Sequence, residues 1–261
     1  MQRKVIFKCV VKTIIFLLVT ILLAPIYFLT LLIFYKWREH IGPELVRFYS
    51  KICLIIFRVH IEEVRNYEIF KKAKKGILII SNHASFLDIF VLSSIFGSVF
   101  VSKSEVKYYP VIGQIIGQIA WLMGSVFLNR DSSRERIKVI KTIANTCSDR
   151  ILVVFPQGTT SRVTEQLPFN RGIFKVIELN PDISILPVTL HYREDAEIAW
   201  HKPQSFRENA MRVSAQDNIH VTVIAHNPVC IDDYRGKTSA EVCRMVEQIV
   251  AEPLRVSCIS R

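Results

Sequence analysis

Residues 77–88 read ILIISNHASFLD and decide the fold class of this 261-residue chain. The first four residues are apolar without interruption, as in a strand that is covered on both faces of a parallel sheet. A polar turn follows, and the apolar stretch beyond it is typical of a helix. A covered strand that leads through a tight turn into a helix indicates an α/β layered domain.

Short β-branched runs alternate with helical stretches along the rest of the chain. We expect strands at 77–80, 99–101, 126–128, 151–155, 183–190 and 219–225. We expect helices at 87–96, 112–122, 133–147, 172–179 and 240–251. This alternation predicts an α/β fold with a central mixed sheet flanked by helices.

The amino-terminal segment has a different character, because residues 13–35 (TIIFLLVTILLAPIYFLTLLIFY) contain no formal charge. One straight helix of that length would span about 34 Å, which is enough to cross the core of a bilayer. The segment is too long for a signal peptide and too apolar on all sides for an ordinary core helix. We therefore expect membrane-embedded anchoring helices in residues 1–60 and an α/β domain in residues 61–261.

The topology of this anchor stays open, because both of its flanks are basic and a clean span carries its positive charge mainly on one side. Pro25 lies in the middle, where it can kink the helix. A simple span and a bent helix that lies in the plane of one leaflet are therefore both compatible with the sequence. A second apolar stretch, 52–57 (ICLIIF), is too short to cross but long enough to lie beside the first.

Composition narrows the possible partners. The formal net charge is +11, half of the residues are hydrophobic, and the mean hydropathy is +0.29. Nucleic acid would account for the charge but not for the apolarity, whereas an anionic membrane surface accounts for both. No zinc-finger or RNA-binding motif is present, so we expect membrane lipids and no nucleic acid as partners. The six cysteines are scattered without a CxxC pair, which argues against a disulfide scaffold or a zinc site.

The turn after the first covered strand holds a candidate catalytic pair, His83 and Asp88. If Ser85 caps the following helix, Asp88 falls at its third position and completes a capping signature. The turn then brings the imidazole back within reach of the carboxylate, which would fix its tautomer and leave the other ring nitrogen as a base. The sequence of the turn is equally compatible with an Asp88 that only caps the helix.

Four segments taken together resemble the signatures of the glycerolipid and lysophospholipid acyltransferases. The segment from Asn82 to Asp88 is similar to the first signature, N-H-x4-D. The others follow in order, with GSVFLNR at 124–130, FPQGTTS at 155–161 and LPVTL at 186–190. Four matches in the family's order, over residues 76–192, make a chance resemblance improbable.

The resemblance implies a direct acyl transfer. In that family the histidine takes a proton from the hydroxyl of an acceptor, which attacks the thioester of acyl-CoA or acyl-carrier protein, and the aspartate orients the histidine. His83 and Asp88 would take these roles, with no cofactor, no metal and no covalent intermediate. The sequence agrees with this, because it contains neither a G-x-S-x-G elbow nor an H-E-x-x-H motif.

The resemblance also implies a substrate-binding set. Arg130 matches the ligand of the acceptor's phosphate, for which the planar guanidinium fork is suited. Lys103 and Arg171 are weaker candidates for the same anionic pocket. The third signature contributes the remaining candidates, Pro156, Gln157, Gly158, Thr159, Thr160 and Ser161. Gly158 and Thr159 are expected to form a tight turn whose backbone N–H groups approach phosphate.

Two residues depart from the family pattern. Gln157 stands where glutamate is usual, so a hydrogen bond can survive but an ion pair cannot. Thr160 stands where the bacterial lysophosphatidate enzymes usually have arginine, and a threonine cannot clamp a phosphate. Arg162, two positions on, could compensate if the segment is extended.

These features favour a membrane-bound acyltransferase that converts 1-acyl-glycerol-3-phosphate, a lyso-lipid acceptor, into phosphatidate. The alternatives are acylation of another lyso-lipid, with a head group or an amino acid, and a non-catalytic lipid-binding protein. The expected location is the cytoplasmic membrane or the endoplasmic reticulum, with the active site facing the cytoplasm.

Overall fold

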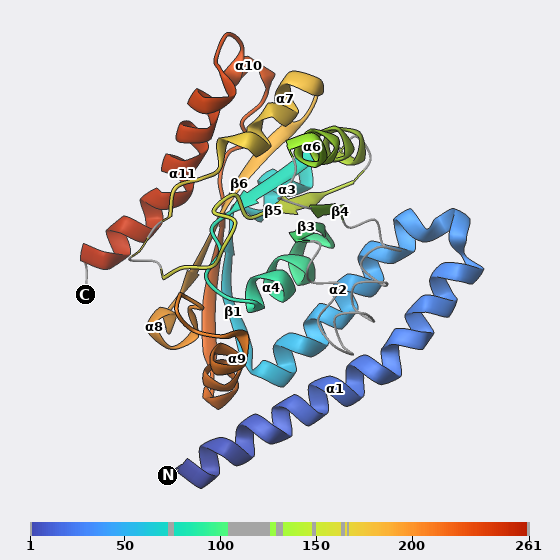
Figure 1. The fold of residues 1–261 in the computed structure, drawn as a ribbon, viewed down its shortest axis with the longest axis vertical. Helices are drawn as coiled ribbons and strands as arrows, with labels where there is room; N and C mark the ends of the chain where they lie inside the picture. The colour runs from blue at the N-terminus through green and yellow to red at the C-terminus, as the bar shows by residue number, and fades with distance from the viewer. Residues whose placement is uncertain are drawn as a thin grey trace.

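The centre of the molecule is a seven-stranded sheet in the order β1-β7-β6-β2-β5-β3-β4 (Figure 1). The computed structural model describes residues 2–72, 76–103, 126–128, 133–147, 150–162, 165 and 167–259. The strands are β1 Val59–Arg65, β2 Ile77–Ser81, β3 Val99–Lys103, β4 Val126–Leu128, β5 Leu152–Val154, β6 Ser184–Tyr192 and β7 Ile219–Ala225. Only β6 and β7 pair antiparallel among these strands, so the predicted mixed sheet is confirmed.

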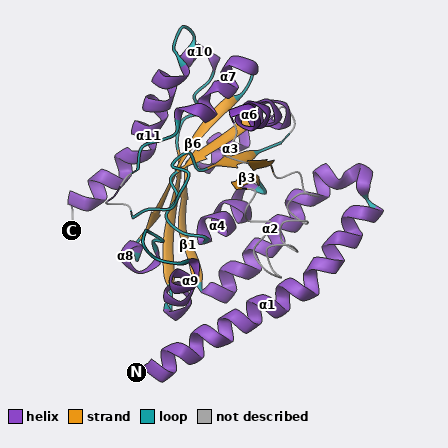
Figure 2. Cartoon of the chain, in the orientation of Figure 1, coloured by secondary structure: helices purple, strands orange, loops and turns teal. Residues whose placement is uncertain are grey.

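Helices cover both faces of the sheet (Figure 2). The longer ones are α1 Gln2–Ile33, α2 Arg38–Phe57, α4 Leu87–Phe96, α6 Ser133–Cys147, α9 Phe206–Ala215 and α11 Ser239–Ile259. The shorter ones are η1 Tyr35–Trp37, α3 Tyr67–Lys72, η4 Arg171–Lys175, α7 Val176–Leu179, α8 Asp195–Ile198 and α10 Ile231–Tyr234. One apolar layer joins the sheet to α6, α7 and α11, and the other joins it to α2, α4 and α9.

Most of the predicted elements are present. The strands at 126–128 and 219–225 and the helices at 87–96 and 133–147 have the predicted bounds. The helix predicted at 240–251 is longer, and the one at 172–179 is a 3-10 turn followed by a single α-helical turn. The helix predicted at 112–122 lies outside the described residues.

Strand β1 was not predicted, because its sequence VHIEEVR carries three charges and its side chains are mostly exposed. The expected division between residues 60 and 61 falls inside this strand, which pairs in parallel with β7.

The order of the strands determines where two of the resembling segments meet. Strand β2 pairs in parallel with β5 on one side and with β6 on the other. The carboxyl ends of parallel strands lie at the same edge of a sheet, where α/β proteins bind their ligands. The turn that begins at Asn82 and the loop that begins at Phe155 therefore lie side by side at this edge.

Asn82 locks the end of β2 to β6. Its side-chain amide donates to the carbonyl of Leu190 at 2.9 Å, and its side-chain oxygen accepts from the N–H of Leu190 at 2.8 Å. The amide thus imitates one more residue of the ladder after β2 has turned away. This fixes the position of the turn relative to the last residues of β6.

Helices α1 and α2 form an antiparallel hairpin beside α4 and α9 (Figure 1). Helix α1 is the one helix in the described residues that is long and apolar enough to cross a membrane, judged by length and composition. One stripe of α1 is buried or bonded against α2 and the α/β domain, and it consists of Lys8, Cys9, Lys12, Phe16, Thr20, Ala24, Tyr27 and Leu31. The stretch at 52–57 ends α2 and packs beside α1, as expected, through Phe57 and Phe16.

The close packing of α2 on α4 depends on Gly97, which ends α4 with a φ of +59°. A Cβ there would lie 2.9 Å from Nη2 of Arg47 and 3.3 Å from Cβ of Pro43. Gly236 also has a positive φ, but a Cβ there would meet nothing within 4 Å.

We predict that Gly236→Ala lowers the free energy of unfolding by about 1 kcal/mol from backbone strain alone, and that Gly97→Ala lowers it by about 2 kcal/mol. Thermal unfolding in detergent measures both, and equal losses would contradict the tight approach of α2.

Candidate active site

His83 and Asp88 form a hydrogen-bonded pair at the carboxyl edge of the sheet. Nδ1 of His83 lies 2.7 Å from Oδ2 of Asp88, and the carboxylate is fully buried while the imidazole remains 18% exposed. Because a carboxylate accepts from Nδ1–H, the other ring nitrogen, Nε2, carries the lone pair. This is the arrangement of a histidine that can act as a general base.

Asp88 also holds the turn that carries His83. Its Oδ2 accepts from the backbone N–H of Ala84 at 2.7 Å and of Ser85 at 3.0 Å. Asp88 therefore does both of the things that the sequence left as alternatives, with the same oxygen. The helix begins at Leu87, and Ser85 Oγ is 3.4 Å from the N–H of Leu87, so the capping contact is weak.

The imidazole is held from a third direction by an aromatic ring. The ring of His83 stacks on Phe155 with centroids 4.0 Å apart and planes 10° apart. This stacking fixes the plane of the imidazole, while the hydrogen bond to Asp88 fixes its rotation within that plane. Nε2 has no partner among the described residues, so it is free to accept a proton from a substrate.

The loop after β5 binds the backbone of His83 on both sides. The side-chain oxygen of Gln157 accepts from the N–H of His83 at 2.7 Å, and the N–H of Ser161 donates to the carbonyl of His83 at 3.0 Å. The loop begins with a tight turn in which the N–H of Gly158 donates to the carbonyl of Phe155 at 3.1 Å, with Gly158 at a φ of +73°. The third resembling segment thus positions the first.

Gln157 keeps the hydrogen bond that the sequence analysis allowed it. Its amide nitrogen faces the carbonyl of Leu167 at 3.4 Å. The amide therefore has an acceptor for its N–H group as well as a donor for its oxygen, and a glutamate could satisfy only the contact to His83.

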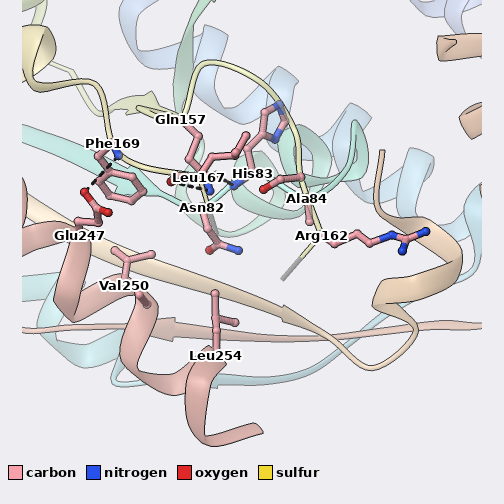
Figure 3. Close-up of a pocket in the computed structure, with 12 residues that line it drawn as sticks. Asn82, His83, Ala84, Gln157, Arg162, Leu167, Phe169, Glu247, Val250 and Leu254 are labelled. Atoms are coloured by element: carbon pink, nitrogen blue, oxygen red, sulfur yellow. Dashed lines mark hydrogen bonds between the residues drawn. The ribbon is translucent and has the colours of Figure 1, made fainter. Parts of the chain in front are cut away.

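A hollow lies beside this turn, between the loop after β5 and α11. It is lined by Asn82, His83, Ala84, Gln157, Ser161, Arg162, Leu167, Phe169, Glu247, Val250, Ala251 and Leu254. Figure 3 shows the imidazole of His83 pointing away from Val250 and Leu254. The backbone of the turn therefore borders the hollow, while the imidazole faces the apolar layer of α4 and Phe155.

Of the other predicted binding residues, some lie in the loop after β5, one lies away from the hollow, and two fall wholly or partly outside the described residues. Pro156, Thr160 and Ser161 are buried in the loop after β5, and Gly158 and Thr159 are partly exposed there. Arg171 is exposed at the start of η4 and does not line the hollow. Lys103 ends β3 at the same edge of the sheet as His83, but its side chain, like the whole of Arg130, lies outside the described residues. Their binding roles stay predictions.

Tyr192 is a residue of the site that the sequence analysis missed. Its hydroxyl donates to Oδ1 of Asp88 at 2.7 Å. The sequence could have pointed to Tyr192, because it follows Leu190 by two residues and alternate residues of a strand lie on the same face of the sheet. An aromatic ring with a polar tip on an inward face needs a buried partner.

Comparison with known proteins agrees with the geometry. The family model described as Acyltransferase matches residues 57–191, which is half of the chain. The chain therefore belongs to the acyltransferase family, and the family resemblance of the sequence is confirmed. Within the described residues no group of three or more His, Cys, Asp or Glu side chains gathers as a metal site.

Curated relatives carry two different acceptor names. The 1-acyl-sn-glycerol-3-phosphate acyltransferase of Neisseria gonorrhoeae is 34% identical over 121 residues, 46% of this chain and 46% of the relative. The lyso-ornithine lipid O-acyltransferase of Rhizobium meliloti is 33% identical over 158 residues, 60% of this chain and 50% of the relative. The chain spans about half the length of the curated relatives it matches.

A solved structure has the same fold over nearly the whole chain. It is the 1-acyl-sn-glycerophosphate (LPA) acyltransferase of Thermotoga maritima, which superimposes with a TM-score of 0.67 over 96% of this chain and 98% of that one. The sequence identity is 18%, so this likeness shows the fold alone. The predicted α/β fold with its amino-terminal apolar helix is confirmed.

We predict that His83→Ala lowers acyl transfer at least about 100-fold, because a general base contributes a factor of that order. Asp88→Asn tests the charge by itself, since the amide oxygen can still accept from the turn while its NH2 group donates to the hydroxyl oxygen of Tyr192. We expect Asp88→Asn to fold and to lose at least about 10-fold, because the amide does not stabilise the imidazolium. Turnover within twofold of wild type in His83→Ala, with folding checked by thermal unfolding, would refute the base.

Gln157 provides a second prediction. Gln157→Leu leaves the buried N–H of His83 without an acceptor, which costs about 1–3 kcal/mol and displaces the imidazole. We expect its turnover to fall at least about 10-fold, whereas Gln157→Glu keeps the acceptor and stays within about fivefold. Gln216→Leu is the matched control, because Gln216 is half-buried and donates to the carbonyl of Arg212 at 3.3 Å. Equal kinetics in Gln157→Leu and Gln216→Leu would contradict the positioning of His83 by this loop.

Proposed function

We propose that this protein transfers a fatty acyl group from acyl-CoA or acyl-carrier protein to the free hydroxyl of 1-acyl-glycerol-3-phosphate at a membrane surface. The observation that carries the proposal is the pair of His83 and Asp88, in which Nε2 has no partner within the part of the chain that the structure describes. In the reaction Nε2 takes the proton of the hydroxyl while its oxygen forms a bond to the thioester carbonyl carbon. The carbon–sulfur bond then breaks, and the imidazolium returns the proton to the thiolate. The products are a diacyl lipid and a free thiol, and no cofactor takes part.

A pair of arginines supports an anionic acceptor. The backbone of Arg162 adjoins the Ser161 N–H that bonds to His83, and its guanidinium forms no ion pair within the described residues. Burial, with Arg162 as the second cause, lowers the pKa of Arg212 on α9 from its usual value. The repulsion between Arg162 and Arg212 is only partly offset by Glu197, the smallest of the three causes, and an excess of positive charge favours binding of an anion such as a phosphate.

The order of the strands supports another source of positive charge for the phosphate, at the end of β4. β4 ends at Leu128 on the carboxyl edge that carries His83, three strands along from β2. Three strand spacings correspond to about 14 Å between the ends of the two strands. By resemblance Arg130, two residues beyond β4 in the sequence, is the main ligand of the phosphate, and Arg162 is proposed as a second cation.

A second acceptor class deserves a test, because Thr160 replaces the usual arginine and one matched relative is named for lyso-ornithine lipid. We propose a comparison of purified protein in vesicles against lysophosphatidate, a lysophospholipid with a head group and lyso-ornithine lipid, with both acyl donors. The proposal predicts that lysophosphatidate is the best acceptor and that Thr160→Arg improves its use. If lyso-ornithine lipid is best and Thr160→Arg lowers that activity, the second class holds. No transfer to any acceptor by folded protein would refute both.

Arg162 gives a sharper prediction about the phosphate. We expect Arg162→Gln to raise the KM for lysophosphatidate about 10-fold or more and to leave the KM for the acyl donor within twofold, because a buried phosphate loses a charged hydrogen bond. Arg207→Gln on the exposed side of α9 removes the same charge and is expected to change neither. Equal effects of the two variants would show that Arg162 acts only through the overall field of the protein.

The membrane part of the proposal rests on how α1 lies. Its contacts with the α/β body extend from Lys8, bound to Asp217, to Phe16, which meets Phe90 of α4, and beyond Phe16 the helix contacts α2. The remaining sides expose apolar residues, among them Leu18 at 61% and Leu22 at 66%. A helix that is fastened to the body over its first half and to α2 over its second half favours the in-plane alternative, with the exposed sides buried in one leaflet.

We therefore predict that Leu18→Glu with Leu22→Glu weakens binding to anionic vesicles about 100-fold or more, because two leucines lose about 3–6 kcal/mol of burial. Ile137→Glu with Ile231→Glu is the control, since these isoleucines are 57% and 38% exposed on α6 and α10. Vesicle flotation measures both pairs. Undiminished binding of the Leu18 and Leu22 variant would show that another surface holds the membrane.

A further inference from the structure

Tyr192 is the last residue of β6, and its side chain lies in the apolar layer between the sheet and α4. The residues of β6 that enter this layer alternate as Leu186, Val188, Leu190 and Tyr192, so the tyrosine continues the inward face of the strand. Its side chain is fully buried, and Tyr192 lies opposite Val221 of β7. The clamp of Asn82 on Leu190 sets the register that brings the ring to the first turn of α4.

The hydroxyl of Tyr192 is a neutral donor to the second oxygen of Asp88. The distance to Oδ1 is 2.7 Å. Burial, together with the charge and the hydrogen bond of Asp88, raises the pKa of Tyr192 well above its usual value. The phenol therefore keeps its proton across the range in which a histidine titrates, and it donates to the carboxylate throughout.

The two oxygens of Asp88 accept hydrogen bonds from different groups: Oδ2 accepts from the turn and from His83, and Oδ1 accepts from Tyr192. Oδ2 already accepts from two backbone N–H groups, which is sufficient to hold the turn. Oδ1 accepts only from Tyr192 among the described residues, so this hydrogen bond is not needed to cap the helix. It does determine the rotation of the carboxylate and how much negative charge remains on Oδ2, which faces His83.

We propose that Tyr192 is a positioning residue of the acyl transfer, which acts through Asp88 to set the proton affinity of His83. A donor on Oδ1 draws charge away from Oδ2 and so stabilises the imidazolium less. The hydrogen bond of Tyr192 therefore weakens the hold of the carboxylate on the imidazolium. The inference rests on the proposed function, because it requires His83 to be the base.

Few other charged groups lie around the pair of His83 and Asp88 in the described residues. In the described part of the chain, the ionisable groups that hydrogen-bond one another here are His83, Asp88 and Tyr192. The packed faces of β7, α2 and α4 contribute apolar side chains. The loop after β5 contributes the cation Arg162, and α11 contributes the carboxylate of Glu247, which no variant below changes. Arg162 is unchanged in the variants below, so it acts as a constant background.

The test compares the pH profile of kcat/KM in Tyr192→Phe and Tyr234→Phe. Tyr234 is also buried, and its hydroxyl donates to the backbone carbonyl of Pro181 at 2.6 Å in the opposite apolar layer. Both variants lose one buried hydroxyl: Tyr192→Phe loses the hydrogen bond to Asp88, and Tyr234→Phe loses those to the carbonyls of Pro181 and Ile183. We expect Tyr192→Phe to lower kcat/KM about fivefold or more at pH 7 and to move its acidic limb upward by about half a pH unit or more. Tyr234→Phe should leave the limb in place.

A second substitution works if Tyr192→Phe does not fold. 3-Fluorotyrosine at position 192 keeps the hydroxyl but makes it a stronger donor, and we expect it to move the acidic limb downward. An unmoved limb in both Tyr192 variants, with His83→Ala inactive, would overturn this inference and leave the proposed function intact. Activity in His83→Ala would overturn the proposed function itself.

Discussion

The fully buried carboxylate of Asp88 is the constraint on which the site depends. An ionised carboxylate taken out of water costs several kcal/mol unless its lone pairs accept hydrogen bonds. Four donors meet that need: the N–H groups of Ala84 and Ser85, Nδ1 of His83 and the hydroxyl of Tyr192. They come from the turn and from β6, so the charge can stay buried only if turn, helix and strand keep their relative positions.

The sheet supplies the second half of this rigidity. Because β5 lies beside β2, the loop after β5 engages both backbone groups of His83, through Gln157 and Ser161. The side chain of His83 is held by Asp88 and by the ring of Phe155. The histidine is therefore fixed by its backbone and by its side chain independently, and only Nε2 is left unengaged in the described structure. Such preorganisation suits a group that must meet a hydroxyl in one orientation.

The sequence was sufficient for the elements whose signal is local. The covered strand at 77–80, the helix at 87–96 and the family signatures are written in consecutive residues. The contact of Tyr192 with Asp88 joins residues 104 positions apart and depends on the register of β6 against β2. No pattern within either segment contains that register. The edge strand β1 was missed for the opposite reason, because its local pattern is polar and only its pairing with β7 makes it a strand.

A row of aromatic rings connects the amino-terminal hairpin to the catalytic turn. Phe16 of α1 contacts Phe57 of α2 at 5.7 Å, and Phe57 contacts Phe86 at 5.6 Å between ring centroids. Phe86 is the residue before Leu87, where α4 begins, two positions from Asp88. Interiors packed in this way transmit displacement instead of absorbing it. If α1 lies in the leaflet, as proposed, its position fixes the height of α4 above the acyl chains, and with it the depth at which Nε2 meets a lipid hydroxyl.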